Sequence, residues 1–252
     1  MESVDFMFGK IHKDIPVPMY YQIKQVILTA IKNGLLQPGE MLPTELAFCE
    51  QYEVSRPTIR RALNELVIEG YLCRLKGKGT FVSSPKIEAK FLSKLQNFND
   101  EMLAKGLTPS TKVITFKVIS GVQDINNRLK RPNSEKLFYL ERVRFANGEP
   151  VVYVETFFSY DQFQKLENVD FVSESLYDSM KLKCNCTVAR VNRMIEAVSV
   201  SQKEATLLEI VKGSAAMLVK TTAFTKQGIP VEYSIARYRG DRNQFSVELE
   251  LE

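Results

Sequence analysis

Apolar residues recur every three or four positions in three segments of the N-terminal part of the chain, which is the period of a helix with one buried face. The segments are residues 18–33, residues 45–51 and a third that begins after Ser55. In the third segment the apolar positions are Ile59, Ala62, Leu63, Leu66 and Val67. Gly70 is a natural stop for that helix, and strand-like runs follow at residues 72–75 and 80–82. The pattern predicts three helices followed by a β-hairpin.

Local chemistry predicts where the second and third helices begin. Thr44 and Ser55 are good N-caps, because a hydroxyl can accept from the free N–H groups of a first turn. Pro57 fits the first turn of the third helix, since its missing N–H costs little there. Only Tyr52-Glu53-Val54 separates the two helices, which is the length of a helix-turn-helix corner. We therefore expect a winged helix-turn-helix.

Positive charge gathers on the third helix and on the hairpin. Arg56, Arg60 and Asn64 follow at steps of four along a polar face, and the hairpin tip reads Lys76-Gly77-Lys78-Gly79. Glycines permit the positive φ angles of a tight hairpin. Residues 55–84 hold six Lys and Arg against two Glu, a local charge of +4 that equals the net charge of the whole chain. This concentration favours DNA as a partner over an ordinary solvated helix face.

Residues 16–82 resemble the DNA-binding domain of the GntR family of bacterial transcription regulators. The matched segments include Pro18-Met-Tyr-Tyr-Gln22-Ile23, Leu42-Pro43-Thr44-Glu45, Val54-Ser55-Arg56-Pro57-Thr58-Ile59-Arg60 and Gly77-Lys78-Gly79-Thr80-Phe81-Val82. The resemblance implies that Arg56, Thr58 and Arg60 enter or flank the major groove, and that the hairpin meets the minor groove or nearby phosphates. The implied DNA-binding set is Thr44, Glu45, Ser55, Arg56, Thr58, Arg60, Lys76, Gly77, Lys78 and Gly79. The family often has a DNA-contacting arginine where this chain has Leu46, so that contact is absent or replaced.

A polar stretch with a proline, Ser83-Ser84-Pro85-Lys86-Ile87-Glu88, has neither helical nor strand period and predicts a linker over residues 83–91. It divides a first domain, residues 1–82, from a second, residues 92–252. In the second domain strand-like runs lie at residues 112–119, 137–145, 151–158, 188–199, 216–225 and 231–238. Helical segments lie at residues 92–105, 125–130, 173–181 and 202–208. Long antiparallel strands with few helices predict an α+β domain built around a sheet.

Residues 92–250 resemble the effector-binding domain of the HutC subfamily, called UTRA, whose fold is like that of chorismate lyase. The motifs are Glu101-Met102-x-x-Lys105-Gly106-Leu107-x-Pro109, Arg142-Val-Arg144-Phe, Gly148-Glu149-Pro150, Ser175-Leu176-Tyr177, Glu204-Ala-x-Leu207-Leu208 and Pro230-Val-Glu232-Tyr233-Ser234. Fold alone does not imply activity. No nucleophile–base–acid set stands out, and the single histidine, His12, precedes the DNA-binding helices. We expect a regulator and no enzyme, with an enzyme of this fold as the rival hypothesis.

Two arginines point to an anionic ligand. Arg142 and Arg144 are two apart on an expected strand and so project from one face, which they share with the apolar Phe138 and Leu140. On a solvated face they would be ordinary surface charges. In a partly buried cleft they would disfavour each other unless an anion joins them, and a phosphate suits the paired donors of arginine.

The resemblance adds further residues to this expected effector site. In relatives that bind sugar phosphates, the two arginine positions hold the phosphate, helped by a loop serine and by the Ser-Leu-Tyr segment. Here Ser175 and Tyr177 match, whereas the loop position is Asn99. Glu155 and Glu232 would accept from sugar hydroxyls and Tyr238 would line the pocket. For either glutamate the alternative is an ordinary surface or hairpin charge. A phosphorylated sugar is the expected effector, and a different acid is the alternative.

The remaining features set limits on partners. Cys184-x-Cys186 has the wrong spacing for a zinc knuckle, and one histidine leaves few nitrogen ligands, so we expect no metal, no cofactor and free thiols. No signal pattern or membrane-length apolar run appears, which predicts a cytoplasmic protein. The expected mechanism is a homodimeric repressor on a pseudo-palindromic operator that the effector releases. A ligand acting as a corepressor is the alternative.

Overall fold

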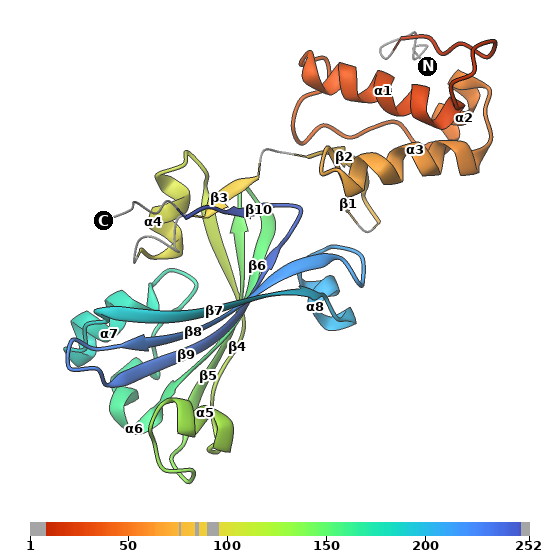
Figure 1. Ribbon diagram of the computed structural model, residues 1–252. Helices are drawn as coiled ribbons and strands as arrows, with labels where there is room; N and C mark the ends of the chain where they lie inside the picture. The colour runs from red at the N-terminus through yellow and green to blue at the C-terminus, as the bar shows by residue number, and fades with distance from the viewer. Residues whose placement is uncertain (1–8, 76, 84–85, 90–95, 248–252) are drawn as a thin grey trace, which may run out of the picture. The chain divides into compact units, whose positions relative to one another are not determined.

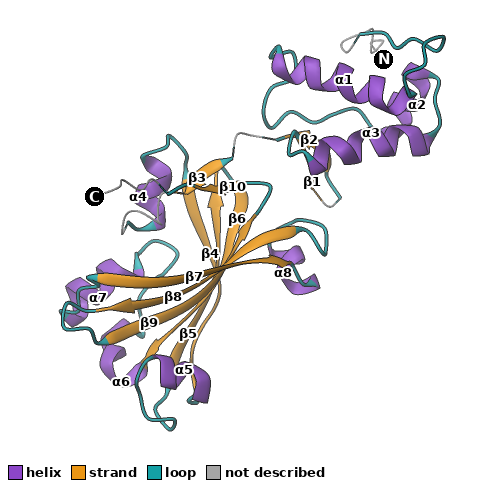
Figure 2. Cartoon of the chain, viewed as in Figure 1, coloured by secondary structure: helices purple, strands orange, loops and turns teal. Residues whose placement is uncertain are grey.

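The computed structural model describes residues 9–75, 77–83, 86–89 and 96–247. Contacts divide the chain into two compact units, Met1–Lys86 and Ile87–Glu252. The first is mainly helical with one small hairpin, whereas the second is rich in strands (Figure 2). The expected fold class, a winged helix-turn-helix followed by an α+β domain with an antiparallel sheet, is confirmed.

The first unit follows the expected order of helix, helix, helix and hairpin (Figure 1). Its elements are α1 Met19–Lys32, α2 Glu45–Tyr52, α3 Arg56–Ile68, β1 Leu72–Leu75 and β2 Gly79–Val82. The two strands pair antiparallel. One core joins all three helices to the hairpin through the buried side chains Ile23, Ile27, Phe48, Ile59, Leu63, Leu66, Leu72 and Val82. That shared core holds the start of α3 in a set position relative to the hairpin.

The two expected caps have different outcomes. Thr44 Oγ1 accepts from the Ala47 N–H at 3.2 Å, so the cap of α2 is confirmed. Ser55 occupies the N-cap position of α3 but makes no side-chain bond to the backbone, and the expected cap is wrong. The Thr58 N–H, which the hydroxyl would have bound, donates to the Ser55 carbonyl at 3.0 Å. The Ser55 hydroxyl instead shares a 2.8 Å hydrogen bond with the Thr58 hydroxyl.

The second unit is built on one six-stranded antiparallel sheet in the order β4-β5-β6-β9-β8-β7. The strands are β4 Pro109–Ile119, β5 Leu137–Ala146, β6 Glu149–Ser159, β7 Arg190–Ser199, β8 Ala215–Phe224 and β9 Pro230–Arg239. The helices are α4 Phe98–Leu103, α5 Gln123–Arg128, α6 Tyr160–Phe163, α7 Leu176–Cys184 and α8 Gln202–Leu207, with a 3-10 turn at Gln164–Leu166. Every strand expected from the sequence is present, with ends that differ from the expected ones by at most three residues.

Helices cover both faces of this sheet. Leu176 and Met180 of α7 pack in one cluster with Phe138 and Phe158. Ala205 of α8 packs with Val143 and Tyr153, whose positions have the opposite parity along the same strands. Because side chains alternate between faces along a strand, α7 and α8 lie on opposite sides of the sheet. The face under α7 is the one that Arg142 and Arg144 share with Phe138.

α6 and the 3-10 turn after it were not expected, and two expected regions have another form. The helix expected over residues 92–105 is α4, six residues long, and residues 92–95 lie outside the described part of the chain. Residues 87–89, expected in the linker, form β3 Ile87–Ala89, which pairs in parallel with β10 Asn243–Phe245. A three-residue strand shows no period of its own, and its partner lies far along the chain, so local pattern could not reveal it.

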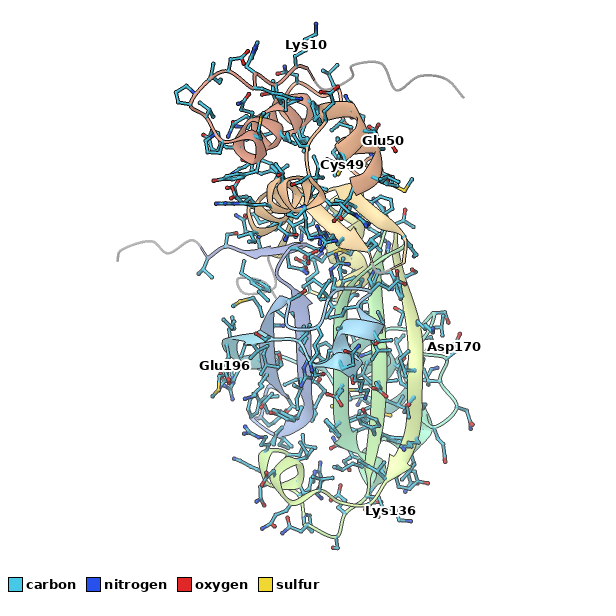
Figure 3. The ribbon with its side chains drawn as sticks, turned by 90° about the vertical axis from the view of Figure 1, so that its right-hand side faces the viewer. Lys10, Cys49, Glu50, Lys136, Asp170 and Glu196 are labelled. Atoms are coloured by element: carbon cyan, nitrogen blue, oxygen red, sulfur yellow. The ribbon has the colours of Figure 1, made fainter. Side chains whose placement is uncertain are left out.

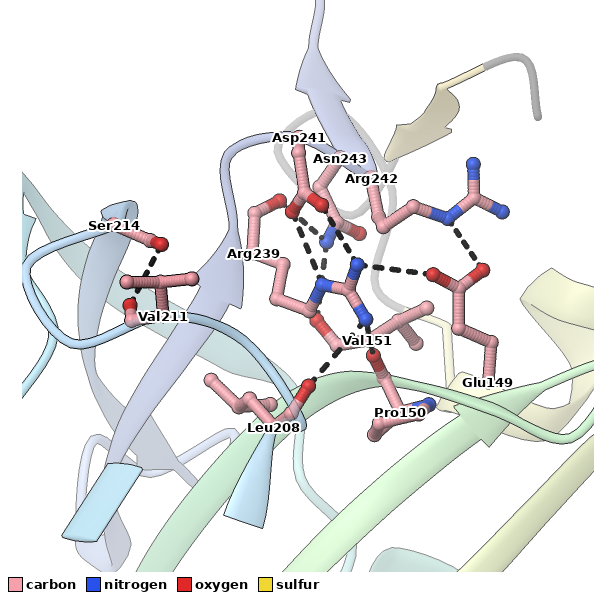
Figure 4. A network of polar contacts seen from close by, with 10 residues as sticks. All are labelled: Glu149, Pro150, Val151, Leu208, Val211, Ser214, Arg239, Asp241, Arg242 and Asn243. Carbon is pink, nitrogen blue, oxygen red and sulfur yellow. Dashed lines mark hydrogen bonds and ion pairs between the residues drawn. The ribbon is translucent and has the colours of Figure 1, made fainter. Parts of the chain in front are cut away.

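A buried cluster of charges fixes the end of β9 beside β10 (Figure 4). Arg239 is fully buried. Its guanidinium contacts Asp241 at 2.7 Å and Glu149 at 2.9 Å, and Nη1 donates to the Pro150 carbonyl at 2.9 Å. Arg242 contacts the same Glu149 at 2.7 Å. Two cations and two carboxylates thus balance each other and tie the start of β6 to the chain that leads into β10.

Candidate functional site

Three arginines of the first unit share one carboxylate. Glu45, the first residue of α2, lies 3.2 Å from Arg60 and 3.8 Å from Arg56 of α3, and 3.5 Å from Arg74 of β1. The side chains of Arg56 and Arg60 are 65% and 56% exposed. The first turn of α2 therefore lies between α3 and the hairpin. A carboxylate is repelled by phosphate, so Glu45, a DNA-binding candidate from the sequence, is placed to orient the arginines.

The other DNA-binding candidates lie at the starts of α2 and α3 and on the hairpin. Thr44, Ser55 and Lys78 are exposed, and Thr58 is half-buried. Gly77 and Gly79 have φ angles of 74° and 126°, as the expected hairpin required. Lys76 lies outside the described residues.

The second unit contains a hollow of about 150 Å³ on the face of the sheet under α7, about ten times what one water needs. Its wall comes from five strands and from the turns that precede α4 and α7. The lining residues include Gln96, Asn97, Phe98, Arg142, Arg144, Val152, Val154, Thr156, Ser175, Tyr177, Arg193, Val219, Thr221, Glu232, Ser234, Ala236 and Tyr238. The space suits a small organic molecule.

The sheet register explains how distant residues reach this hollow. Directly opposite one another on successive strands stand Thr156, Ser234, Thr221 and Arg193. A second row across the sheet is Arg142, Val154, Ala236 and Val219. The first row offers three hydroxyls and ends at Arg193. The second row begins at Arg142 and continues as an apolar floor. The hollow therefore has polar and apolar parts set side by side.

Arg142 is the most unusual group in the hollow. It is 5% exposed, and its Nε and Nη1 have no hydrogen-bond partner among the described residues. Burial lowers the pKa of Arg142 well below its ordinary value, and the neighbouring Arg144 cation lowers it further. Arginine stays charged in proteins nonetheless. A buried cation with unmade hydrogen bonds is costly until an acceptor arrives.

Arg144 has partners for its guanidinium within the protein, whereas two nitrogens of Arg142 have none among the described residues. Its Nη1 donates to Thr111 Oγ1 at 2.7 Å, and the guanidinium lies 5.5 Å from the centre of the Phe98 ring. Burial lowers the pKa of Arg144 to about 10. The two arginines therefore share one partly buried face, as the sequence indicated.

A carboxyl–phenol pair occupies the same hollow. Tyr177 Oη donates to Glu232 Oε2 at 3.0 Å, and Glu232 is 2% exposed. Burial raises the pKa of Glu232 to about 7, although hydrogen bonds from Ser234 and Tyr177 oppose the rise. Burial also raises the pKa of Tyr238 to about 12. Near neutral pH the site thus holds neutral phenols and a half-protonated carboxyl beside its arginines.

The structure brings together six of the eight expected effector residues: Arg142, Arg144, Ser175, Tyr177, Glu232 and Tyr238. Ser175 also caps α7, where its hydroxyl accepts from the Asp178 N–H at 3.4 Å. Asn99 is not part of the lining. Its Oδ1 is buried without a partner among the described residues, and the neighbouring Asn97 and Phe98 line the hollow in its place.

The expectation for Glu155 is wrong. Glu155 lies between Val154 and Thr156 on β6, so it points to the opposite face of the sheet. There it accepts from Tyr139 Oη at 2.9 Å and pairs with Arg237 at 2.9 Å. A strand's period shows which residues share a face, but it does not show which face lines a cavity.

Several lining residues were missed in the sequence. Ser234 stands two positions after Glu232 on one strand, and that spacing was a usable signal. Arg193 had no such signal, because its place depends on β7 pairing with β8.

Comparison with known proteins gives the family. The model of bacterial regulatory proteins of the gntR family matches residues 19–82, and the UTRA domain matches residues 104–244. The chain is 36% identical over 235 residues to the transcriptional repressor NagR of Bacillus subtilis, covering 93% of this chain and 96% of that protein. The chain belongs to the GntR family of bacterial transcription regulators. Its UTRA domain places it in the HutC subfamily.

Other relatives agree with this assignment. The histidine utilization repressor of Pseudomonas putida is 31% identical over 209 residues, 81% of this chain and 82% of that protein. The crystal structure of PhnF from Mycobacterium smegmatis shares the fold, with a TM-score of 0.65 at 24% identity over 90% of this chain and 99% of that chain. This GntR-family chain is therefore a DNA-binding transcriptional repressor and not an enzyme.

Two further observations concern metals and membranes. Among the described residues no group of three or more His, Cys, Asp or Glu is placed to hold a metal ion. Within the same part of the chain, no helix has the length and apolar character needed to cross a membrane.

We predict that Glu45→Gln lowers sequence discrimination. The neutral amide no longer attracts the three arginines by charge. Loss of the carboxylate also removes its repulsion of the DNA phosphates. The ratio of operator affinity to random-DNA affinity should fall about tenfold, within the range of one arginine–guanine contact, while random-DNA affinity rises. Fluorescence anisotropy at fixed salt measures both. Glu50→Gln, on the exposed side of the same helix (Figure 3), is the matched control, and equal ratios in the two variants would contradict the orienting role.

We also predict that Glu232 makes the unliganded protein less stable as pH rises. The pKa of Glu232 in the folded protein is about 7, above the ordinary value of 4.5. Between these two pH values the folded state binds more protons than the unfolded state, so the free energy of unfolding falls as the pH rises from 4.5 to 7. Glu232→Gln should raise the unfolding free energy at pH 8 by at most about 3 kcal/mol and change it little at pH 4.5. Urea unfolding of both proteins at the two pH values measures this, and an equal difference at both would contradict it.

Proposed function

We propose that this chain is a homodimeric cytoplasmic repressor whose binding to operator DNA is released by a phosphorylated sugar in the second unit. The observation that carries the proposal is Arg142, a buried guanidinium with two N–H-bearing atoms lacking partners among the described residues. A second cation, Arg144, stands beside it. A phosphate offers acceptors to both and offsets two buried charges with one ligand group.

The rest of the hollow supports a hydroxyl-rich ring as the remaining part of the ligand. Thr156, Thr221 and Ser234 offer hydroxyls in one row, and Glu232 accepts hydrogen bonds. Val154 and Ala236 form an apolar floor against which the C–H face of a sugar ring can pack. Ligand pockets commonly combine such a floor with a few placed polar groups.

The names of relatives indicate two chemical classes of effector. A relative in Escherichia coli K12, 28% identical over 230 residues, is named a probable fructoselysine utilization operon transcriptional repressor, and fructoselysine is a sugar derivative. Another relative is named for histidine utilization. A non-phosphate carboxylic acid is therefore the second candidate effector, and the arginine pair suits a carboxylate as well.

For the output, two copies of the first unit would meet a pseudo-palindromic operator through the two-fold axis of a dimer. The proposed DNA contacts come from α3 and the hairpin, with Arg56, Arg60 and Lys78 as the described cations. The effector changes operator affinity only as far as it binds one arrangement of the dimer better than another.

A structural route from the hollow to the start of the second unit supports such coupling. Tyr238 lines the hollow and the next residue is Arg239, centre of the buried charge cluster (Figure 4). Beyond the cluster, the Arg242 carbonyl accepts from the Ile87 N–H at 2.7 Å. Ile87 also packs in one apolar cluster with Val152 and Ala236 of the hollow. A ligand that moves Tyr238 thus acts on β3, the first strand after the DNA-binding unit.

We predict that a sugar phosphate dissociates the operator complex of the wild-type protein, whereas the unphosphorylated sugar does not. In Arg142→Gln the required concentration should rise at least 30-fold, because two charge-assisted hydrogen bonds are lost. Anisotropy of a labelled operator, selected from a random library, measures release. Arg190→Gln, an exposed arginine of β7, is the control.

The same titration separates the alternatives. If none of a panel of hexose and hexosamine phosphates releases the operator, the proposal of a phosphorylated sugar as effector is contradicted. Release by a carboxylic acid alone would favour the second candidate, and tighter binding on ligand addition would show a corepressor.

We predict that Arg242→Ala uncouples the two units. Removing its pair with Glu149 loosens β10 and hence β3, while Arg239 still holds Glu149. Effector affinity by calorimetry and operator affinity without effector should stay within about twofold, and the effector's effect on operator affinity should shrink at least fivefold, the lower end of typical allosteric coupling. Lys220→Ala, which breaks an exposed pair on β8, is the control. Full coupling in Arg242→Ala would contradict this route.

A further inference from the structure

Glu232 is a carboxyl group buried in the same hollow as the arginines. It comes from β9 and is 2% exposed, and it lines the hollow together with Arg142 and Arg144. Tyr177 Oη donates to it at 3.0 Å, and Ser234 adds a second hydrogen bond. An acidic group in a site that is proposed to take an anion needs an explanation, because like charges repel strongly when they are shielded from water.

Charged groups from two other strands act on this carboxyl group. Burial raises the pKa of Glu232 to about 7, and the cations Arg142 of β5 and Arg193 of β7 oppose the rise. From α7 the neighbour is Tyr177, which stays neutral because burial raises its pKa well above the ordinary value. The side chains that β6 and β8 present to the hollow are valines and threonines, which carry no charge. The carboxylate of Glu232 therefore depends on the two arginines for compensation of its charge.

An anion in the hollow removes part of this compensation. Nε and Nη1 of Arg142 lack partners among the described residues, so an anion that enters binds there. The charge of Arg142 is then offset by the ligand and favours the carboxylate of Glu232 less. The ligand also adds negative charge to the same enclosed space. Both changes disfavour the carboxylate and favour the neutral carboxyl group, whose O–H can donate a hydrogen bond.

We propose that the hollow binds its anion together with one proton, which Glu232 takes up. The inference rests on the proposed function, because it requires the anion site at Arg142, and it adds that pH regulates this site. Affinity for the anion, and with it release of the operator, decreases as the pH rises through the range in which unliganded Glu232 loses its proton. Tyr177 and Tyr238 stay neutral over that range, since burial raises the pKa of each phenol.

The probe for this proposal is sulfate. Sulfate carries two charges at every pH used, whereas a phosphate monoester loses a proton at about pH 6. Calorimetric titration of the full-length chain at pH 7, in MOPS and in imidazole, gives the number of protons taken up, because the heats of ionisation of the two buffers differ. We expect about 0.5 proton per sulfate, since Glu232 is half-protonated before binding and fully protonated after it. Between pH 6 and pH 8 the affinity should fall about eightfold.

The variants assign the proton to Glu232. Arg142→Gln should lose the binding heat that belongs to the hollow. Glu232→Gln keeps the shape of the side chain but does not titrate, so it should take up no proton and bind sulfate equally at pH 6 and pH 8. Glu155→Gln is the matched control, because Glu155 also accepts from a tyrosine, Tyr139, but on the opposite face of the sheet. It should keep the wild-type proton uptake.

A further variant gives a second readout if Glu232→Gln folds poorly. Tyr177→Phe removes a hydrogen bond that favours the carboxylate of Glu232. More of Glu232 is then protonated before the anion binds, so the proton uptake at pH 7 should be smaller than in the wild-type protein.

Two results would overturn the inference alone. One is sulfate binding that depends on Arg142 but takes up no proton. The other is proton uptake that persists unchanged in Glu232→Gln. If the wild-type chain binds no sulfate, or if Arg142→Gln leaves the binding unchanged, the anion site itself is contradicted, and the proposed function fails together with this inference.

Discussion

The alternation of side chains along antiparallel strands is the constraint on which the binding chemistry of the second unit depends. Arg142, Thr156, Ser234, Thr221 and Arg193 come from five strands, yet the register places all of them on one face. Each neighbour in sequence faces away. The two faces of this sheet therefore differ: the face under α7 carries the hollow that we propose as the effector site, and the face under α8 carries a set of internal ion pairs.

Two buried arginines of this sheet show how burial of charge distinguishes structure from function. Arg239 is fully buried and meets Asp241, Glu149 and backbone carbonyls, so its charge is compensated within the protein and it stabilises the junction with β10. Arg142 is almost as deeply buried, yet two of its nitrogens lack partners among the described residues. This difference between the two arginines supports the proposal that an acceptor from a ligand completes the hydrogen bonds of Arg142.

In the first unit, the carboxylate of Glu45 compensates cations within the protein, as Glu149 and Asp241 do in the second. Glu45 contacts arginines from α3 and from β1, so it links the helix and the hairpin that are proposed to meet DNA. In free protein the carboxylate restrains flexible guanidinium groups, which reduces the conformational entropy lost on binding. On the proposal that these arginines meet DNA, groups of the DNA replace the carboxylate as their partners.

The sequence by itself determined the order of elements, the winged helix-turn-helix, the strands of the sheet and the arginine pair of the hollow, because these depend on local periods, turn residues and spacing within one strand. Only the tertiary structure decided that Arg193 joins the hollow, that Glu155 leaves it and that Ile87 pairs with Asn243. The physical reason is the same in each case. Strand order and the choice of buried face arise from pairing between distant segments, and no local pattern along the chain records which segment will be the partner.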